Sequence, residues 1–570
     1  MLIGLDVGGT YTDAVLIDEE AWDREEKPLL KAVKAPTRAD SVLPGVIQAL
    51  EEVLEGENPE RIKRLCVSST LGLNALLTGR EDRTCILAVP GPGINPALFR
   101  GEGETLCVLS GAEDHRGIVV APLDQGEVRQ ALRRFSAQGI AACALVTKFS
   151  PKNPEMEYAL RDLAREELGP DTPIACGSEA SGALNFPRRL HTAYCNASLS
   201  RIGGDFASAL TQAAARLGLT CPIVIMKADA GVFSNADAAA EPAASMGSGP
   251  AASLMGVLAL LPFLKTDGNP RQDLLMVDMG GTSTDLALLA HGQPLLAREG
   301  LTVAGKPSLI RSLWTSSIAL GGDSVLSWDN GVPRIGPGRL GPALALSPED
   351  LGRRPPTLTD ALVALGHARV GDPEVSRTAL QALVPDVQDG ALAFVRAALE
   401  RIRREADALL DAVNAKPVYT IRELLVADKL KPQAAVFIGG PAGAMAPLAR
   451  QILELPILVP PVAACANALG AALARPTRMA DLYADTLRGR MSMTALGIEE
   501  VIDSGYTLEA AKRDIVAALD RLEDQAAGEK TAAQIVFAES FQVLDPQGRG
   551  RIIKVRAQRA AGLLRTREAI

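Results

Sequence analysis

The chain carries the same eight-residue motif twice. Residues 6–13 read Asp-Val-Gly-Gly-Thr-Tyr-Thr-Asp and residues 278–285 read Asp-Met-Gly-Gly-Thr-Ser-Thr-Asp, so six of the eight positions are identical. Each copy lies between two short apolar runs. A Gly-Gly pair in that setting is typical of a tight β-hairpin, because glycine tolerates the positive φ angles of such turns. The motif therefore predicts two hairpins of one design, carried by two similar α/β halves.

The residue types of the motifs favour binding of phosphate and of a divalent cation. Glycines without a Cβ let backbone N–H groups approach phosphate oxygens, and threonine hydroxyls add donors. An aspartate at the end of a strand can hold Mg²⁺ through its water ligands. The candidate phosphate-binding residues are Gly8, Gly9, Thr10, Thr12, Gly280, Gly281, Thr282 and Thr284. Asp6 and Asp278 are the candidate metal-binding and catalytic acids, unless both hairpins are only structural.

The aspartates that close the two motifs allow two interpretations. Asp13 and Asp285 are candidate catalytic residues, because either could serve as a base. They could also stabilise the turns by bonding to the backbone, which is a common role of aspartate beside a turn. The sequence leaves both roles open.

Composition predicts several domains and excludes some classes of partner. A chain of 570 residues exceeds what one core usually supports, so about two to four domains are expected. A net charge of −9, no long Lys/Arg run and 4% aromatic residues argue against binding nucleic acid or anionic membranes. The longest apolar stretch, residues 251–264, is too short to span a bilayer and predicts a buried helix. The chain opens directly into a strand, without room for a signal peptide, so we expect a soluble cytoplasmic protein.

Cysteine and histidine show no spacing that predicts a metal site. The eight cysteines are scattered without a C-x-x-C pair, and several lie in apolar runs, which favours reduced, buried thiols. The four histidines are far apart, so no zinc site is expected. A Ser-His-Asp triad stays open, although no G-x-S-x-G motif occurs to present its serine.

Strand and helix patterns alternate along the first part of the chain. The predicted strands are residues 2–7, 14–18, 65–68, 85–89 and 140–147, and the predicted helices are residues 40–55, 124–138 and 153–168. Ser69, Thr70 and Asn74 lie where a strand enters a helix. That position allows two interpretations. The start of the helix could face substrate or phosphate, or the Ser and Thr could simply be N-cap residues. We take these three residues as candidate substrate contacts.

The alternation continues to about residue 475 and then changes. Helices are predicted at residues 187–217, 251–264, 400–414 and 467–473, and strands at residues 222–226, 302–314, 318–325 and 434–438. The small residues of 467–473 fit close packing between helices. Beyond residue 476 a helix at 508–522 and strands at 534–538 and 552–555 predict a separate C-terminal portion.

The order of these elements resembles the superfamily of actin, the heat-shock chaperone ATPases and the sugar kinases. Two phosphate hairpins are followed by a strand ending in Gly439 and Gly440, and then by the small-residue helix. The resemblance implies an α/β fold with two similar actin-like ATPase halves around a nucleotide cleft, plus a small C-terminal α+β portion. It also implies ATP as a ligand, with Gly439 and Gly440 beside the adenosine. The expected domains are residues 1–190, 191–475 and 476–570.

A closer resemblance covers roughly residues 1–475, which are similar to the ATP-binding A subunit of the hydantoinase/oxoprolinase family. The form Asp-x-Gly-Gly-Thr-x-Thr-Asp at both sites carries this resemblance, and residues 248–251 (Ser-Gly-Pro-Ala) and 356–361 (Pro-Thr-Leu-Thr-Asp-Ala) support it. It implies ATP- and Mg²⁺-dependent opening of a hydantoin- or oxoproline-like cyclic amide, or carboxylation of a ketone as in other members. It further implies a B-type partner subunit, and hence a homo- or hetero-oligomer.

The chain departs from the family pattern in ways that bear on the substrate. The family's Gly-Gly-Gly-Ser appears here as residues 321–324, in which Gly321, Gly322 and Asp323 are candidate cofactor-binding residues. A family segment rich in glycine and proline is reduced at residues 336–342, and the chain is shorter than typical members. Arg188 and Arg189 are candidates to pair with a substrate carboxylate, or are solvated helix residues. Two other functions stay open: a small-molecule kinase of the same fold, or a nucleotide-gated ATPase that acts on a partner protein.

Overall fold

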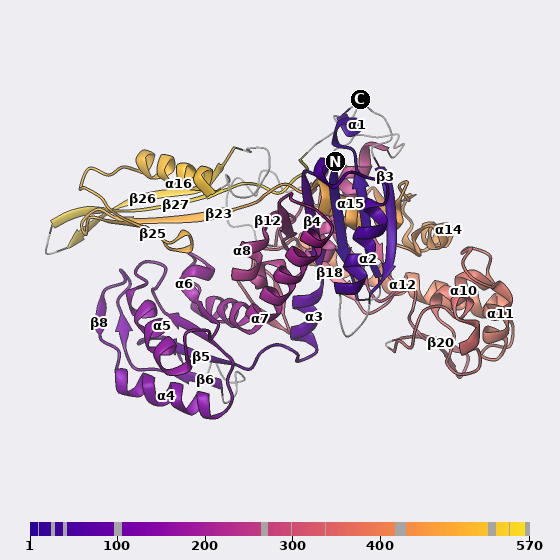
Figure 1. The fold of residues 1–570 in the computed structure, drawn as a ribbon, viewed down its shortest axis with the longest axis horizontal. Helices are drawn as coiled ribbons and strands as arrows, with labels where there is room; N and C mark the ends of the chain where they lie inside the picture. The colour runs from indigo at the N-terminus through magenta and orange to yellow at the C-terminus, as the bar shows by residue number, and fades with distance from the viewer. Residues whose placement is uncertain are drawn as a thin grey trace.

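The computed structural model of the protein describes residues 1–9, 11–23, 29–37, 43–95, 105–263, 272–297, 299–336, 338–415, 429–522, 532–545 and 548–564. Two mixed sheets form the centre of the molecule, and further lobes extend from it on both sides (Figure 1).

The N-terminal hairpin lies in the middle of the first sheet. Strand β1 (Leu2–Val7) pairs antiparallel with β2 (Tyr11–Ile17) and parallel with β4 (Arg64–Ser69). The sheet order is β12-β11-β4-β1-β2-β3, with β3 at Leu29–Pro36, β11 at Ile223–Met226 and β12 at Val232–Ser234. Helix α2 (Leu43–Leu54) covers one face, because its apolar residues recur every three or four positions and point to the sheet. The C-terminal part of α7 (Phe186–Arg216) completes this layer.

The second sheet repeats the arrangement of the first. Strand β13 (Leu274–Met279) pairs antiparallel with β14 (Thr284–Ala290) and parallel with β21 (Ala434–Ile438). The sheet order is β15-β14-β13-β21-β22, with β18 also pairing with β14. The remaining strands are β15 (Gln293–Pro294), β18 (Thr315–Ile318) and β22 (Ile457–Leu458). In each half, therefore, a central strand has an antiparallel partner on one side and a parallel partner on the other.

The two hairpins match in register and in turn geometry. Asp6 lies opposite Asp13 in the first hairpin, and Asp278 lies opposite Asp285 in the second. The Gly8 N–H donates to the Tyr11 carbonyl at 3.0 Å, and the equivalent bond from residue 280 to residue 283 measures 2.9 Å. These pairs confirm the predicted hairpins, and the two sheets confirm the predicted α/β fold with two similar actin-like halves.

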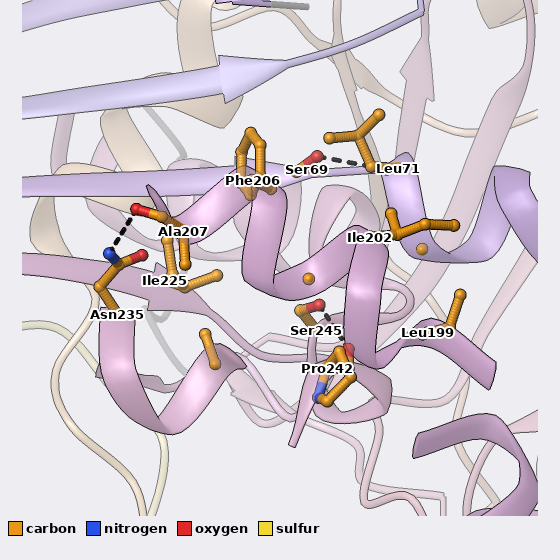
Figure 2. Close-up of a pocket in the computed structure, with 13 residues that line it drawn as sticks. Ser69, Leu71, Leu199, Ile202, Phe206, Ala207, Ile225, Asn235, Pro242 and Ser245 are labelled. Carbon is orange, nitrogen blue, oxygen red and sulfur yellow. Dashed lines mark hydrogen bonds between the residues drawn. The ribbon is translucent and has the colours of Figure 1, made fainter. Parts of the chain in front are cut away.

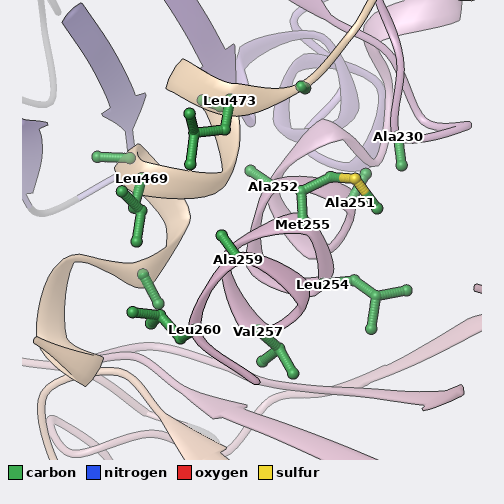
Figure 3. Close-up of a cluster of buried hydrophobic side chains, with 14 of the residues drawn as sticks. Ala230, Ala251, Ala252, Leu254, Met255, Val257, Ala259, Leu260, Leu469 and Leu473 are labelled. Atoms are coloured by element: carbon green, nitrogen blue, oxygen red, sulfur yellow. The ribbon is translucent and has the colours of Figure 1, made fainter. Parts of the chain in front are cut away.

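Two helices of small residues join the halves. Helix α9 (Ser248–Leu260) and helix α15 (Ala466–Leu473) pack against each other in one shared core (Figure 3). A Cβ on Gly470 would overlap the Ala252 carbonyl of α9, and a Cβ on Gly4 of β1 would overlap the Ala468 carbonyl of α15. Glycine therefore permits both close approaches. The predicted buried helix and the predicted close packing of the small-residue helix are both confirmed.

An α/β lobe is inserted into the first half and lies below the C-terminal sheet in Figure 1. Its parallel sheet has the order β10-β9-β5-β6, formed by β5 (Thr84–Val89), β6 (Leu106–Val108), β9 (Ala142–Thr147) and β10 (Ile174–Cys176). Helices α4 (Gln125–Ala137) and α5 (Glu155–Leu168) cover one face, and the N-terminal part of α7 covers the other. Burial on both faces explains why these strands are continuous apolar runs. Smaller elements are α1 (Glu19–Asp23), α3 (Leu71–Leu77), β7 (Ala112–Glu113), β8 (Val119–Ala121), α6 (Gly177–Ala180) and α8 (Asn235–Ala240).

A helical lobe extends from the second half on the opposite side of the molecule (Figure 1). Its core joins the core under the second sheet. Its elements are β19 (Leu326–Asp329), β20 (Val332–Ile335), α10 (Leu358–Ala364), α11 (Pro373–Gln381), α12 (Val387–Asn414) and, nearer the sheet, α14 (Ala442–Leu453).

The C-terminal portion is a five-stranded antiparallel sheet with one helix. Helix α16 (Leu508–Leu522) has the predicted bounds and packs on one face of the sheet. The strand order is β25-β24-β23-β27-β26, formed by β23 (Met479–Asp485), β24 (Arg490–Met493), β25 (Ile498–Val501), β26 (Gln534–Asp545) and β27 (Gly548–Gln558). The predicted strands at 534–538 and 552–555 are thus parts of longer ones.

The structure differs from the prediction between residues 302 and 325. The expected strand at 302–314 is reduced to β16 (Thr302–Val303) and β17 (Lys306–Pro307), because Ala304 and Gly305 have positive φ and make a turn. The expected strand at 318–325 is also wrong, since β18 ends at Ile318 and a glycine turn follows. The domain boundaries stay predictions, but sheet pairing favours a boundary later than residue 190, because β11 and β12 belong to the first sheet.

The helices in the described ranges include none that is both long and apolar enough to cross a membrane.

Candidate functional site

The structure brings the two predicted metal-binding acids together through one amide. Asn467 Nδ2 donates to Asp6 Oδ2 at 3.2 Å and to Asp278 Oδ2 at 3.1 Å. Asp6 also accepts a hydrogen bond from the Ser68 hydroxyl, and Asp278 accepts one from Ser253 Oγ at 2.6 Å. Ser68 lies on β4, Ser253 on α9 and Asn467 on α15, so the orientation of both carboxylates depends on elements of both halves.

Burial disfavours the ionised forms of these acids. It raises the pKa of Asp6 to about 6, although hydrogen bonds from Ser68 and Asn467 act in the opposite direction. Burial likewise raises the pKa of Asp278, and it raises the pKa of Asp285 to about 7. Within the residues that the structure describes, Asp13 alone among the four motif acids has a short ion pair, with Lys34 Nζ at 2.9 Å. The centre between the hairpins is therefore a concentration of poorly compensated negative charge.

This donor set fits Mg²⁺. Mg²⁺ prefers oxygen ligands and is usually bound by one or two carboxylates, with waters and phosphate oxygens completing its shell. Asp6 and Asp278 supply two such carboxylates, whose charge the cation would neutralise. No cluster of three ligating side chains occurs in the described ranges, which is compatible with a cation held partly by a polyphosphate.

The hairpin turns expose some of the predicted phosphate-binding groups and bury others. A Cβ on Gly9 would meet no atom within 4 Å, so the backbone there borders open space. Thr12 is buried and shares a 3.0 Å hydrogen bond with Thr37, and Thr284 Oγ1 donates to the Leu320 carbonyl at 2.7 Å. These two hydroxyls are used inside the protein, so we expect them to shape the hairpins. Thr10 lies outside the described residues.

The turn at residues 320–324 packs on the second hairpin. The N–H of Gly322 donates to the Gly280 carbonyl at 2.9 Å, and that of Asp323 donates to the Gly281 carbonyl at 2.7 Å. A Cβ on Gly321 would overlap the backbone of Thr282, so only glycine fits this approach. The structure thus places all three predicted residues of this turn beside Gly280, Gly281 and Thr282.

Gly439 and Gly440 also lie beside the second hairpin. Gly439 follows β21 with φ of 90°, and a Cβ there would lie 2.8 Å from Asp278 Oδ1. A Cβ on Gly440 would meet nothing within 4 Å, so its surroundings are open. The predicted proximity to adenosine stays a prediction, but the location beside the second hairpin is the one that it requires.

The start of α3 lies beside the first hairpin. The Thr70 N–H donates to the Val7 carbonyl at 3.5 Å, and Asn74 Nδ2 donates to Thr70 Oγ1 at 3.2 Å. Ser69 exchanges two bonds with Ser248 Oγ of α9, through its N–H at 3.1 Å and its carbonyl at 2.9 Å. These contacts connect the strand end to the helix that joins the halves.

A small cavity opens behind the same strand end. Ser69, Leu71 and Gly72 line it together with residues of α7, including Leu199 and Phe206 (Figure 2). Its volume of about 30 Å³ holds about one water molecule. The cavity is too small for a cyclic amide, so substrate contacts of Ser69 or Thr70 would have to lie on the hairpin side.

The two arginines at the start of α7 lie in the inserted lobe. Arg188 makes a 2.9 Å ion pair with Glu299. Arg189 is fully buried, and its Nη2 donates to the carbonyls of Thr147 at 2.8 Å and Lys148 at 2.7 Å, while its Nη1 binds Ser150 Oγ. These bonds give Arg189 a structural role at the end of β9. The predicted substrate contact of both arginines receives no support from this geometry and stays a prediction.

Glu113, whose pKa is affected by the charge of Arg189, should make the free energy of unfolding depend on pH. Burial raises its pKa to about 7, even though Thr147 Oγ1 and the Phe149 N–H donate to Oε2. A raised folded-state pKa means that the folded protein holds the proton more tightly, so this group lowers stability as pH rises from about 4.5 to 7. Glu113→Gln should therefore raise the free energy of unfolding by about 1–3 kcal/mol at pH 8. At pH 4.5 it should have little effect, and equal urea midpoints of the two proteins at pH 8 would contradict the expectation.

Comparison with known proteins places this geometry in a family. The Hydantoinase/oxoprolinase family model matches residues 189–480, and the model of the Hydantoinase/oxoprolinase N-terminal region matches residues 2–168. The chain belongs to the hydantoinase/oxoprolinase family. Both matches include one complete hairpin motif, so the paired hairpins belong to the part of the chain that defines the family.

Several family relatives are long enough to align over most of the chain. It is 23% identical to the caprolactamase subunit alpha of Pseudomonas jessenii, over 88% of this chain and 76% of that one. It is 26% identical to 5-oxoprolinase of Saccharomyces cerevisiae, over 64% of this chain and 31% of that enzyme. Among solved structures, nucleotide-free acetone carboxylase has a TM-score of 0.68 at 16% identity and covers all of this chain and 88% of its own. The ATP-dependent caprolactamase from Pseudomonas jessenii has a TM-score of 0.67 at 18% identity, covering 99% and 88% of the two chains. These two structures confirm the fold.

One residue that the structure places at the centre was missed in the sequence. Asn467 was assigned only to a helix of small residues, yet it contacts both motif acids of this family member. The available signal was a single amide within the run Ala-Ala-Cys-Ala-Asn-Ala-Leu-Gly-Ala-Ala-Leu at residues 463–473. A polar side chain in a buried helix needs a hydrogen-bond partner, which should direct attention to the strand ends that the helix covers.

Proposed function

We propose that this chain is an ATP-dependent catalytic subunit that activates a cyclic amide of the hydantoin or oxoproline type for ring opening. The observation that carries the proposal is the pair of matching hairpins whose acids, Asp6 and Asp278, are joined by Asn467. Membership of the hydantoinase/oxoprolinase family supports it, as do relatives named caprolactamase and 5-oxoprolinase, which act on cyclic amides by their names.

The two hairpins would hold the polyphosphate of ATP from opposite sides. Backbone N–H groups beside Gly9 and Gly281 would face it, and Asp6 and Asp278 would hold Mg²⁺ between the halves. Mg²⁺ supplies neutralisation of phosphate charge during transfer. Phosphoryl transfer needs in-line positioning and charge stabilisation more than covalent help from the protein. Side chains fixed by hydrogen bonds from both halves meet that need, because they are already oriented before the substrate arrives.

The reaction that fits this site has three bond exchanges. The amide oxygen attacks the γ-phosphorus of ATP, the bond to the bridging oxygen breaks, and ADP leaves with the electron pair. The amide carbon then adds water, and the ring C–N bond breaks as its nitrogen takes up a proton, which leaves an acyl phosphate. A second water then hydrolyses this acyl phosphate to the ring-opened acid and inorganic phosphate. A base is needed for the attacking water, and Asp13, Asp285 and Asp323 are the acids beside the hairpins that could accept that proton.

We also propose that a partner subunit completes the hydrolytic site. Relatives of this chain are named as subunits: alpha of caprolactamase, gamma of acetophenone carboxylase from Aromatoleum aromaticum and beta of acetone carboxylase from Xanthobacter autotrophicus. The described ranges contain no metal cluster of the kind that activates water. The A-type chain would then supply phosphoryl activation, and the partner would supply or shape the water-binding part.

Nucleotide binding provides the first test. A ligand that binds only the folded state stabilises it by about 2.7 kcal/mol at 100 times its Kd. A thermal-unfolding series with ATP, ADP and Mg²⁺ should show a rise in Tm that requires both nucleotide and cation. No shift at millimolar nucleotide would refute the proposed site.

The product formed separates the possible activities. Purified chain should be incubated with Mg·ATP and a panel of cyclic amides, with and without the B-type protein from the same source, and ADP, phosphate and ring-opened acid should be quantified. Ring opening that needs the second protein is the expected result. Stable phosphorylated substrate would instead identify a kinase, and ATP turnover independent of every amide would favour an ATPase that acts on a partner.

A further inference from the structure

Arg354 carries a buried guanidinium whose two outer nitrogens find no hydrogen-bond acceptor among the described residues. Its side chain is only 7% exposed, and Nε donates to Asp350 at 3.0 Å. Nη1 and Nη2 are both buried and have no hydrogen-bond partner within the ranges that the structure describes. Arg189 is a contrast, because both of its outer nitrogens bind carbonyl or hydroxyl oxygens. Leaving charged donors buried and unpaired is costly, so a guanidinium in this state points to a missing acceptor.

The segments that carry Arg339 and Arg354 pack on the residues that follow Asp323, because the Val325 N–H donates to the Gly338 carbonyl at 3.2 Å and the Leu326 N–H to the Pro356 carbonyl at 2.9 Å. Asp323, whose N–H donates to the Gly281 carbonyl, feels the charges of Arg339 and Arg354, which partly offset the effect of burial on its pKa. Its carboxylate lies so close to Gly281 that a Cβ on that glycine would overlap it. The acid thus contacts the hairpin, and its charge attracts both guanidinium groups.

Gly341 packs against the buried guanidinium of Arg354. A Cβ on Gly341 would lie 3.4 Å from the central carbon of that guanidinium, so any larger residue there would contact the group. Gly341 has φ of 141°, a conformation that favours glycine. Arg339 lies two residues before it, is exposed and faces the same acid. Two arginines, one anchored by Asp350 and one exposed, therefore act on Asp323 beside the second hairpin.

We propose that Arg354, assisted by Arg339, binds a phosphate group at the second hairpin. An arginine fork with two free N–H donors matches the spacing of two phosphate oxygens, which lysine cannot reproduce. The inference rests on the proposed function and extends it, because it adds a phosphate contact from outside the repeated motif. The phosphate is either the γ-phosphoryl group of the nucleotide or the inorganic phosphate released after transfer, since both present the same tetrahedral oxyanion.

The test compares Arg354→Gln with Arg353→Gln, its exposed neighbour, in the full chain with Mg²⁺. Dissociation constants are measured by calorimetry for ADP, for a non-hydrolysable ATP analogue and, on the ADP-bound protein, for inorganic phosphate. Loss of charge-assisted hydrogen bonds should weaken binding of the phosphate-bearing ligand at least about tenfold in Arg354→Gln and leave ADP affinity unchanged. Weaker binding of the analogue alone assigns the γ-phosphoryl group, and weaker binding of inorganic phosphate alone assigns the released product.

Two further variants distinguish a lost phosphate contact from a folding defect. Arg354→Lys keeps the positive charge and can still pair with Asp350, but lacks the fork, so it should also lose at least about fivefold in affinity. Asp350→Asn breaks the ion pair and keeps the guanidinium, and it should retain affinity within about threefold. Affinities of Arg354→Gln and Arg354→Lys equal to those of Arg353→Gln would overturn the inference. Wild-type protein that binds no nucleotide would overturn the proposed function and this inference together, whereas normal nucleotide binding in every variant overturns the inference alone.

Discussion

Replacement of Asp278 by Asn is expected to lower ATP turnover by about 100-fold or more, and Asp6→Asn should do the same. Each carboxylate lies at a strand end beside a Gly-Gly turn, and the two share one amide donor across the joint between the halves. Removal of one group that stabilises transition-state charge typically costs about 10²–10³ in turnover. Asn keeps the shape and the hydrogen-bond acceptor but not the charge, so the loss should appear in turnover and in Mg²⁺ dependence.

Stability measurements distinguish this loss from unfolding. Burial raises the pKa of both acids, which means that the ionised carboxylates are unfavourable in the folded protein at neutral pH. Neutral Asn should therefore leave the free energy of unfolding unchanged or increase it. Asp18→Asn is a matched control, because Asp18 follows the far end of β2 and accepts a local hydrogen bond from the Glu20 N–H. Wild-type turnover in Asp6→Asn and Asp278→Asn would mean that the hairpins are structural.

The hairpins could be predicted because their signals are local. A Gly-Gly pair between apolar runs determines a turn and two strands without reference to the rest of the chain. The repeat then implied that Asp6 and Asp278 occupy equivalent positions, and the register of both sheets confirms it. The buried strand before Gly439 was predictable for the same reason, since its five residues are all apolar and all buried.

Contacts between distant segments could not be predicted in the same way. The role of Asn467 depends on α15 lying against β1 and α9, which a short run of small residues indicates only as close packing. The apolar run at 318–320 suggested a strand. However, the N–H groups of Gly322 and Asp323 donate to carbonyls in the turn of the second hairpin, so the strand does not continue through them. Arg354 has no signal in the sequence, because it stands out only through two buried guanidinium nitrogens that find no acceptor in the part of the chain that the structure describes.

The C-terminal sheet shows a third limit. Strands β23 to β25 were not predicted, and β26 and β27 are longer than expected. In these strands apolar and polar residues alternate only weakly. Phe537, Phe541 and Leu544 of β26 are 45–73% exposed, so the apolar residues do not identify a buried face of the sheet. Helix α16 could be predicted because only one of its faces is apolar, and that face packs on the sheet.

Gly470→Ala is expected to cost about 3 kcal/mol or more in the free energy of unfolding. The added Cβ would overlap the carbonyl oxygen of Ala252 and the backbone nitrogen of Gly256, both of which belong to α9. Backbone atoms of a buried helix cannot rotate away as a side chain can, so the two helices must separate, and such overpacking typically costs about 1–3 kcal/mol and occasionally more. Because α15 also carries Asn467, separation should move that amide from one of the acids and reduce the stabilisation that Mg·nucleotide provides.

Gly443→Ala gives the matched comparison, since this glycine lies in helix α14 and a Cβ there would meet no atom within 4 Å. Alanine favours a helix over glycine by about 1 kcal/mol, so this variant should be as stable as the wild type or more stable. Urea unfolding of both variants, with and without Mg²⁺ and ADP, measures the difference. Equal midpoints for Gly470→Ala and the wild type would mean that α9 and α15 are not held in the close packing that places Asn467 between the two acids.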